Sequence, residues 1–463
     1  MADLSIAHRA ALAQLLGNVP DGTLTQLALL AAGMAGTRAR DLEEMLDAER
    51  LDRVRRGRAF APLIPLFRPR ADGVASMTFP ARVLGRVWKI ASQGEADFLP
   101  ILDDQEERSI GRATQVSARL CVAAAAAVRD QPDAVWPVAW SEAQVREKGL
   151  TDLACSFDLG LLAHRAMPSL KAWVGRPSED QLAELRLLVR DAAAIAPDGT
   201  QRLLDILFAN LADAALVLRL VSHSSSAAGR EVFLAESELA VFVERLIGAV
   251  EDRVATIARW RPADVKDVVG PLQEILTWSA GVLTELDMTI EMRAGGVWGK
   301  QVRDARIRIN EKLSRLLGSV EGAVDKALPT IRMQTSGRMT RRVPRLDVAV
   351  DDEAVQAATA ALALLRAVRT TAGVFGCEQQ RWSVLEALKE SLSAYADAGL
   401  EAINAGDWPD ETLALNMIGT AAGFLELIEA TDAARTVRRR AVVAGTPPTF
   451  KPLNLPVRPF QAA

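Results

Sequence analysis

Hydrophobic positions recur every three or four residues along most of the chain, which is the repeat of an α-helix that buries one face. The repeat is clearest in the middle of the chain, where two stripes each fit one helix face. These stripes are Leu239, Val243, Leu246, Val250, Val254 and Ile257, and then Ile309, Leu313, Leu316, Val320 and Val324. A third apolar segment, around residues 272–286, lies between them. We therefore expect a bundle of three long antiparallel helices over residues 229–328, each about 25–30 residues long.

Breaks rich in proline, glycine or arginine divide the rest of the chain. We expect seven segments: short N-terminal helices (1–57), a proline-containing loop (58–80), a helical domain (81–228), the bundle of long helices (229–328), an arginine-rich linker (329–350), a C-terminal helical subdomain (351–441) and a proline-rich extended tail (442–463).

Several helix ends can be placed by their capping residues. Ser178 is followed three residues later by Gln181, which is the pattern of a capping box at a helix start. We expect helices over 81–92, 150–173, 178–196 and 199–222 in the first half. In the C-terminal subdomain we expect helices over 353–374, 378–405 and 409–440.

Composition supports the helical interpretation. Apolar residues make up 49% of the chain but aromatic residues only 5%, so much of the apolar content is alanine and leucine. These two residues favour helices, whereas sheets favour β-branched and aromatic residues. The sequence therefore predicts an all-α fold of multi-helix bundles. High alanine and arginine usage also suits a bacterium of high genomic GC content.

Charge and cysteine content indicate a protein of the cytoplasm. The net charge is −4, which gives no global attraction to nucleic acid or to an anionic membrane. The three scattered cysteines suit a reducing compartment. No apolar stretch approaches the ~20 residues of a membrane span, and the N-terminus lacks the pattern of a signal peptide. We expect a cytoplasmic protein without a transmembrane segment.

Recognisable catalytic and cofactor-binding motifs do not stand out. The glycines before Lys300 resemble a nucleotide loop, but Gln301 stands where the loop needs a hydroxyl, so we interpret them as a turn. Cys155 and His164 invite a nucleophile–base pairing, but they lie nine residues apart and would face opposite sides of one helix. We expect no cofactor and no metal, and we name no catalytic residue. Two carboxylates that meet in the fold would suffice for acid–base catalysis, so an enzyme remains an alternative.

The strongest anomaly is a run of arginines without acids. The segment 329–346 contains five arginines, and the helix expected before it adds further basic residues. The candidate partner- or anion-binding residues are Arg332, Arg338, Arg341, Arg342, Arg345, Lys300, Arg303 and Arg308. Such a cluster suits an acidic protein or a nucleic-acid backbone. The structural alternative is a solvated linker whose arginines pair with nearby acids such as Asp347, Asp351 and Asp352.

These observations leave three functional hypotheses. The first is a non-enzymatic helical scaffold or adaptor that mediates protein–protein interactions or self-association. The second is a nucleic-acid-associated regulator that binds phosphates through segment 329–346, although no aromatic residue lies there to stack on bases. The third is an enzyme without a recognisable motif. Whether the basic residues form one surface depends on the fold.

Overall fold

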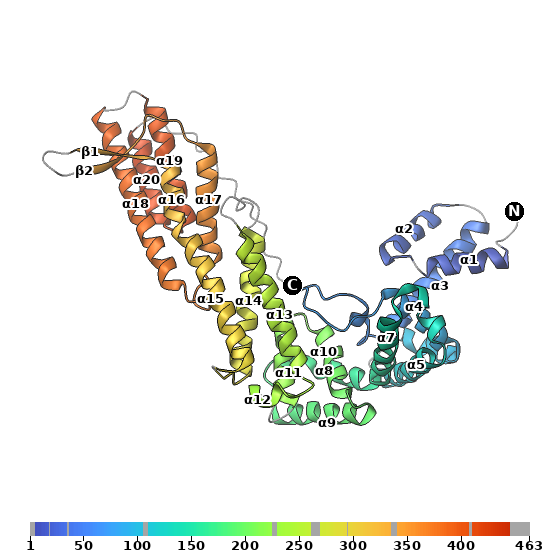
Figure 1. The fold of residues 1–463 in the computed structure, drawn as a ribbon. Coiled ribbons are helices and arrows are strands. Elements are labelled where there is room, and N and C mark those ends of the chain that lie inside the picture. The colour runs from blue at the N-terminus through green and yellow to red at the C-terminus, as the bar shows by residue number, and fades with distance from the viewer. Residues whose placement is uncertain are drawn as a thin grey trace. The chain divides into compact units, whose positions relative to one another are not determined.

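The fold is almost entirely helical. The computed structural model describes residues 5–17, 19–34, 37–104, 110–224, 229–260, 269–293, 295–334, 340–406 and 410–444. Within these ranges one two-stranded hairpin accompanies the helices, which confirms the expected all-α class (Figure 1). No helix in the same ranges is long and apolar enough to cross a membrane.

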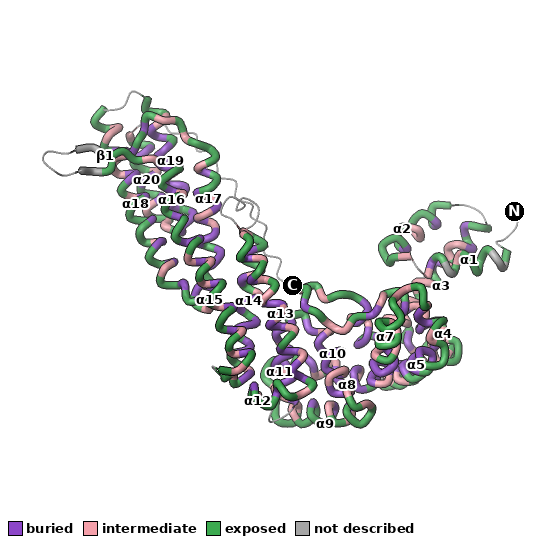
Figure 2. The backbone as a smooth tube through the Cα atoms, in the orientation of Figure 1, coloured by how far each residue is buried: buried purple, intermediate pink, exposed green. Residues whose placement is uncertain are grey.

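The chain divides into two compact units. The first unit contains Met1–Ala249 and Glu285–Gly296, and the second contains Val250–Thr284 and Val297–Ala463. Helices α13 (Ala240–Arg259) and α14 (Val269–Thr289) therefore contribute residues to both. In each unit, buried positions recur along the helices (Figure 2).

The first unit begins with three helices, α1 (Ile6–Leu16), α2 (Asp21–Ala32) and α3 (Thr37–Ala59). Their shared core is small: its buried members are Leu16, Leu24, Ala31 and Leu46.

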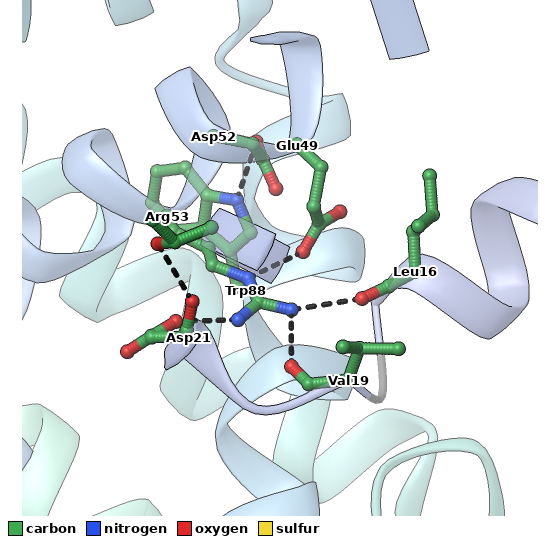
Figure 3. A network of polar contacts seen from close by, with 8 residues as sticks. Leu16, Val19, Asp21, Glu49, Asp52, Arg53 and Trp88 are labelled. Atoms are coloured by element: carbon green, nitrogen blue, oxygen red, sulfur yellow. Dashed lines mark hydrogen bonds and ion pairs between the residues drawn. The ribbon is translucent and has the colours of Figure 1, made fainter. Parts of the chain in front are cut away.

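A single arginine reinforces this small core. Arg53 on α3 donates to the carbonyl oxygens of Leu16 and Val19, at 2.8 and 2.7 Å, where α1 ends. Its Nε atom donates to Glu49 at 2.8 Å, and the guanidinium also pairs with Asp21 at the start of α2 (Figure 3). One side chain thus connects all three helices.

The first unit continues with the helices η1 (Ile64–Phe67), α4 (Ala81–Gln93), η2 (Ala96–Asp103), α5 (Ile110–Asp130), α6 (Pro132–Val135), η4 (Val138–Trp140), α7 (Ala143–Asp158), α8 (Gly160–Val174), α9 (Glu179–Ile195), α10 (Gly199–Asn210), η5 (Ala214–Leu216), α11 (Val217–Ser224) and α12 (Glu231–Leu234). Aromatic rings pack at its centre, where Phe60 meets Trp88 and Phe157 edge-on at 5.6 and 5.0 Å. The Trp88 indole donates to Asp52 at 2.7 Å (Figure 3).

In this unit the sequence predicts where helices start better than it predicts where they are interrupted. α4 starts at Ala81 as expected, and both bonds of the Ser178–Gln181 capping box are present. The expected helix over 150–173 is wrong, because α7 ends and α8 begins at Leu159. The expected helix over 199–222 is also wrong, because α10 ends at Asn210 and α11 begins only at Val217. A Cβ on Gly160 would lie 2.5 Å from Cys121 Sγ, so the glycine lets α8 approach α5 at this break.

The second unit is built on long helices. α15 (Val297–Gly318) and α16 (Val320–Ala327) follow α13 and α14, and all residues of the two predicted apolar stripes are buried. Lys312 of α15 donates to the carbonyl oxygens of Ala258, at 3.2 Å, and Trp260 at the end of α13. Arg306 of α15 donates to the carbonyl oxygen of Leu283 in α14 at 3.1 Å. α13, α14 and α15 thus pack together, although their 20, 21 and 22 residues are fewer than expected.

Four helices complete the second unit: α17 (Asp352–Ala367), α18 (Glu378–Ala405), α19 (Glu411–Leu427) and α20 (Thr431–Ala444). α18 has the predicted bounds and ends at Gly406, whose φ is 70°. The single helix expected over 409–440 is wrong, because a turn at Glu429, with φ 65°, separates α19 from α20. The first three residues of the expected extended tail, 442–444, are instead helical and belong to α20, and the rest of the tail, from 445 onward, lies outside the described residues.

Candidate partner-binding surface

The candidate surface is a β-hairpin in the segment that the sequence analysis assigned to a linker. Strands β1 (Thr330–Gln334) and β2 (Thr340–Pro344) pair in antiparallel fashion. Arg345 N donates to the carbonyl oxygen of Pro329 at 2.9 Å and extends the pairing by one step. We call β1, β2 and Arg345 the arginine hairpin.

The arginine hairpin is anchored on α18. β2 packs against that helix, and the hairpin lies beyond the end of α16 in Figure 1. Leu346, directly after the hairpin, is buried. One of its methyl groups would lie 3.7 Å from a Cβ on Gly399 of α18, so the side chain packs closely on the helix. The packing of β2 and Leu346 on α18 therefore holds the hairpin in place.

The register of the hairpin places two arginines directly opposite each other. Arg332 pairs with Arg342 across the strands, and both side chains are exposed. Side chains opposite each other in an antiparallel pair have Cβ atoms about 4.5–5.5 Å apart, and like charges there repel. The hairpin therefore carries a concentrated positive charge that an anion would stabilise.

Two of the three nearby acids that the sequence offered, Asp347 and Asp351, already have partners. Asp347 pairs with Arg345, whose Nε lies 3.2 Å from Oδ1. Asp351 caps α17 by accepting from Glu353 N and Ala354 N. Among the residues that the structure describes, neither Arg332 nor Arg342 forms an ion pair.

The sequence also offered Arg338 and Arg341 as candidate residues. Arg338 lies outside the described residues, as does the side chain of Arg341, whose backbone belongs to β2.

The basic residues of α15 do not join this surface. Lys300, Arg303 and Arg308 are exposed on α15. At about 1.5 Å per residue, α15 and α16 place roughly 40 Å between Lys300 and the hairpin. Arg308 instead approaches Glu251 of α13 at 4.0 Å. The candidate residues therefore form two separate groups.

The other arginine-rich runs are largely paired. In the N-terminal run, Arg55 pairs with Asp103 in addition to the contacts of Arg53. On α20, Arg435 pairs with Asp432 at 3.3 Å, and Arg440 pairs with Asp397. These runs differ from Arg332 and Arg342, because carboxylates already neutralise many of their charges.

A shallow hollow of about 630 Å³ follows the outer face of α20. Its lining mixes basic and apolar side chains with one acid: Glu426, Thr431, Arg435, Arg438, Arg439, Val442 and Val443. Arg438 pairs with Glu426 at 2.6 Å, so part of its charge is compensated within the hollow.

The candidate nucleophile–base pair does not form. Although the helix breaks between Cys155 and His164, His164 Nε2 donates to the carbonyl oxygen of Ala59 at 2.8 Å. Burial raises the pKa of the Cys155 thiol, which works against thiolate formation. The described residues contain no group of three or more histidine, cysteine or acidic residues that could hold a metal ion.

The carboxylate of Glu231 lies against the glycine turn before Lys300. Glu231 accepts a hydrogen bond from Arg293 N at 2.6 Å. Its carboxylate oxygens would lie 2.2 Å from a Cβ on Gly296, which shows how closely the acid approaches the turn. A negative group at this position opposes phosphate binding.

Sequence reasoning missed one unusual arginine in the second unit. Arg381 in the first turn of α18 is buried, and it lies three residues before Val384 on the stripe that continues with Leu388 and Leu392. A basic residue on an apolar stripe was therefore visible in the sequence.

Comparison with known proteins adds no assignment: no family model matches the chain, and no curated protein or solved structure matches it.

Proposed function

We propose that this chain is a non-enzymatic helical scaffold that binds an acidic segment of a protein partner through the arginine hairpin. The observation that carries the proposal is the cross-strand pair Arg332 and Arg342, which is exposed and has no carboxylate partner among the described residues. A glutamate or aspartate of the partner would accept hydrogen bonds from both guanidinium groups and relieve their repulsion.

The backbone of the hairpin supports a protein partner. β1 pairs with β2 on one side only in the described sheet. The free edge of a strand can accept an extended peptide by main-chain hydrogen bonds, which nucleic acid cannot supply. The hairpin thus combines a peptide-binding edge with side chains that select acidic residues.

Charge distribution favours the acidic protein over nucleic acid. A protein that binds duplex DNA strongly neutralises several phosphates, about 6–10 in well-studied cases. The basic group on α15 lies roughly 30 Å (Arg308) to 40 Å (Lys300) from the hairpin along the helices, so the two groups do not form one continuous basic track.

The proposal is tested by titrating fluorescein-labelled probes with the full chain and measuring fluorescence anisotropy. One probe is a glutamate-rich peptide, and the other is a random-sequence DNA duplex of equal charge. The variant Arg332→Gln/Arg342→Gln is compared with Arg435→Gln/Arg440→Gln, which removes the same charge from arginines that already have acidic partners.

We expect the peptide to bind the wild type and the control variant with similar affinity. The hairpin variant should lose about tenfold in affinity per arginine, which corresponds to about 1.4 kcal/mol each. Tighter binding of the duplex than of the peptide would support the nucleic-acid regulator instead. Equal loss in both variants would show that net charge, and not the hairpin, determines binding.

A further inference from the structure

A buried arginine in the second unit has an unsatisfied Nε atom and no ion pair among the described residues. The exposed fraction of Arg381 is 6%, and its Nε atom has no hydrogen-bond partner among the described residues. The guanidinium lies 5.1 Å from the ring of Trp382, which offers an attractive face but accepts no conventional hydrogen bond. Buried charges in proteins are normally paired, so this one calls for an explanation.

Arg381 lines a small cavity with two further arginines. Arg366 and Arg369 reach it from the end of α17, and Glu429 reaches it from the turn between α19 and α20. The cavity measures about 20 Å³, roughly the space of one water molecule. We call Arg366, Arg369, Arg381 and Glu429 the arginine notch.

Glu429 occupies the rim of the arginine notch. Its carboxylate lies 2.8 Å from Arg369 and 3.5 Å from Arg366, and all three side chains are about half exposed or more. No ion pair joins it to Arg381 in the described structure. The outer arginines are therefore engaged by an exposed acid, while the inner arginine is not.

The backbone at Glu429 is unusual for a glutamate. Ala430 N donates to the carbonyl oxygen of Leu425 at 2.9 Å, which closes the turn after α19. Glycine is the usual residue at the left-handed position of such a turn, yet Glu429 adopts a φ of 65° there. Non-glycine residues in this conformation are strained and are found frequently at ligand-binding sites.

The charges at the notch leave a positive excess. Three guanidinium groups face one carboxylate. α17 and α19 end here, and their C-termini contribute about half a negative charge each, whereas the N-termini of α18 and α20 contribute about half a positive charge each. The remainder is about two positive charges, which suits one phosphate group at neutral pH.

We propose that the arginine notch binds a phosphate group at its rim, between Arg366 and Arg369, with a single phosphate oxygen in the small cavity beside the buried Arg381. Arg366 and Arg369 would turn from Glu429 to the phosphate oxygens, so that Glu429 competes with the ligand for the same two arginines. Guanidinium groups on α17 and α18 approach from different helices, which suits a tetrahedral oxyanion with three free oxygens better than a planar carboxylate. This proposal does not depend on the arginine hairpin.

The test uses inorganic phosphate as the probe and the line width of its ³¹P resonance in the presence of the full chain. Arg381→Met removes the buried charge and keeps a side chain of similar length. Glu429→Gln removes the competing carboxylate and keeps the backbone conformation. Arg440→Gln serves as the control, because that exposed arginine pairs with Asp397 outside the notch.

We expect the wild type to broaden the phosphate resonance and Glu429→Gln to bind phosphate about tenfold more tightly. Arg381→Met should abolish broadening without lowering the melting temperature, because it removes an unpaired buried charge. Acetate at equal ionic strength should displace phosphate poorly. Broadening that survives Arg381→Met, absence of broadening in both the wild type and Glu429→Gln, or equal competition by acetate would overturn the proposal.

Discussion

Replacing Arg53 with methionine should release α1 and α2 from the first unit while leaving the remaining helices folded. The substitution keeps much of the apolar stem but removes the bonds to the carbonyl oxygens of Leu16 and Val19 and leaves the largely buried Glu49 carboxylate without its partner. Breaking a buried pair of this kind costs about 3–5 kcal/mol. The bond to Asp21 adds little, because that side chain is 88% exposed.

This cost should exceed what the small core of the three helices can tolerate. Among the described side chains, four form its buried part. Hydrogen exchange measured by mass spectrometry should show amides of α1 and α2 exchanging about a hundredfold to several thousandfold faster, the factor that corresponds to about 3–5 kcal/mol. Exchange in α4, α5 and α8 should not change.

Arg50→Met provides the matched control for this prediction. Arg50 lies on the same helix, and its contact with Asp47 is long, at 3.7 Å, and exposed. Unchanged exchange of α1 and α2 in Arg53→Met would refute the role of Arg53, as would equally fast exchange in Arg50→Met.

Three further predictions concern the first unit. Gly160→Ala should destabilise it by about 1–3 kcal/mol, because the new Cβ would meet Cys121 Sγ at 2.5 Å; chemical denaturation should show partial recovery when Cys121→Ala is added. Burial lowers the pKa of His164, so the unfolded chain binds more protons and stability should fall as pH drops below about 6.5. Urea midpoints at pH 8 and pH 5 should differ less in His164→Gln; an unchanged difference would contradict this. Burial raises the pKa of Cys121 to about 12, so a thiol reagent should label it only after unfolding, and rapid labelling of the native chain would refute its burial.

Local capping and helical periodicity carried enough information to place several helices. The capping box at Ser178 depends only on neighbouring residues, and it forms as expected. The bounds of α18 follow from Glu378 at its start and from Gly406, whose left-handed conformation ends it. The two apolar stripes, one on α13 and one along α15 and α16, are buried because each repeats over several turns.

Helix interruptions were harder to predict, because tertiary contacts determine them. The break at Leu159 allows Gly160 to approach Cys121, which lies far away in the sequence. The turn at Glu429 contains neither glycine nor proline, so the usual indications of a helix end are missing.

The candidate surface was predicted in part. The arginines of segment 329–346 were recognised, but an arginine-rich stretch shows little strand periodicity, and the pairing of Arg332 with Arg342 follows only from the register. The distance between Lys300 and the hairpin also required the fold. Arg381 was overlooked because the apolar residues that follow it fit the helix repeat, and one charged residue does not disturb that repeat.

Charge reversal at the arginine hairpin tests the central claim most directly. The variant Arg332→Glu/Arg342→Glu should stop binding the glutamate-rich peptide and should bind a lysine-rich peptide of the same length instead, with an affinity that falls as salt rises. The wild type should show the opposite preference. If the variant and the wild type keep the same preference, the cross-strand pair does not select the partner and the proposed function is wrong.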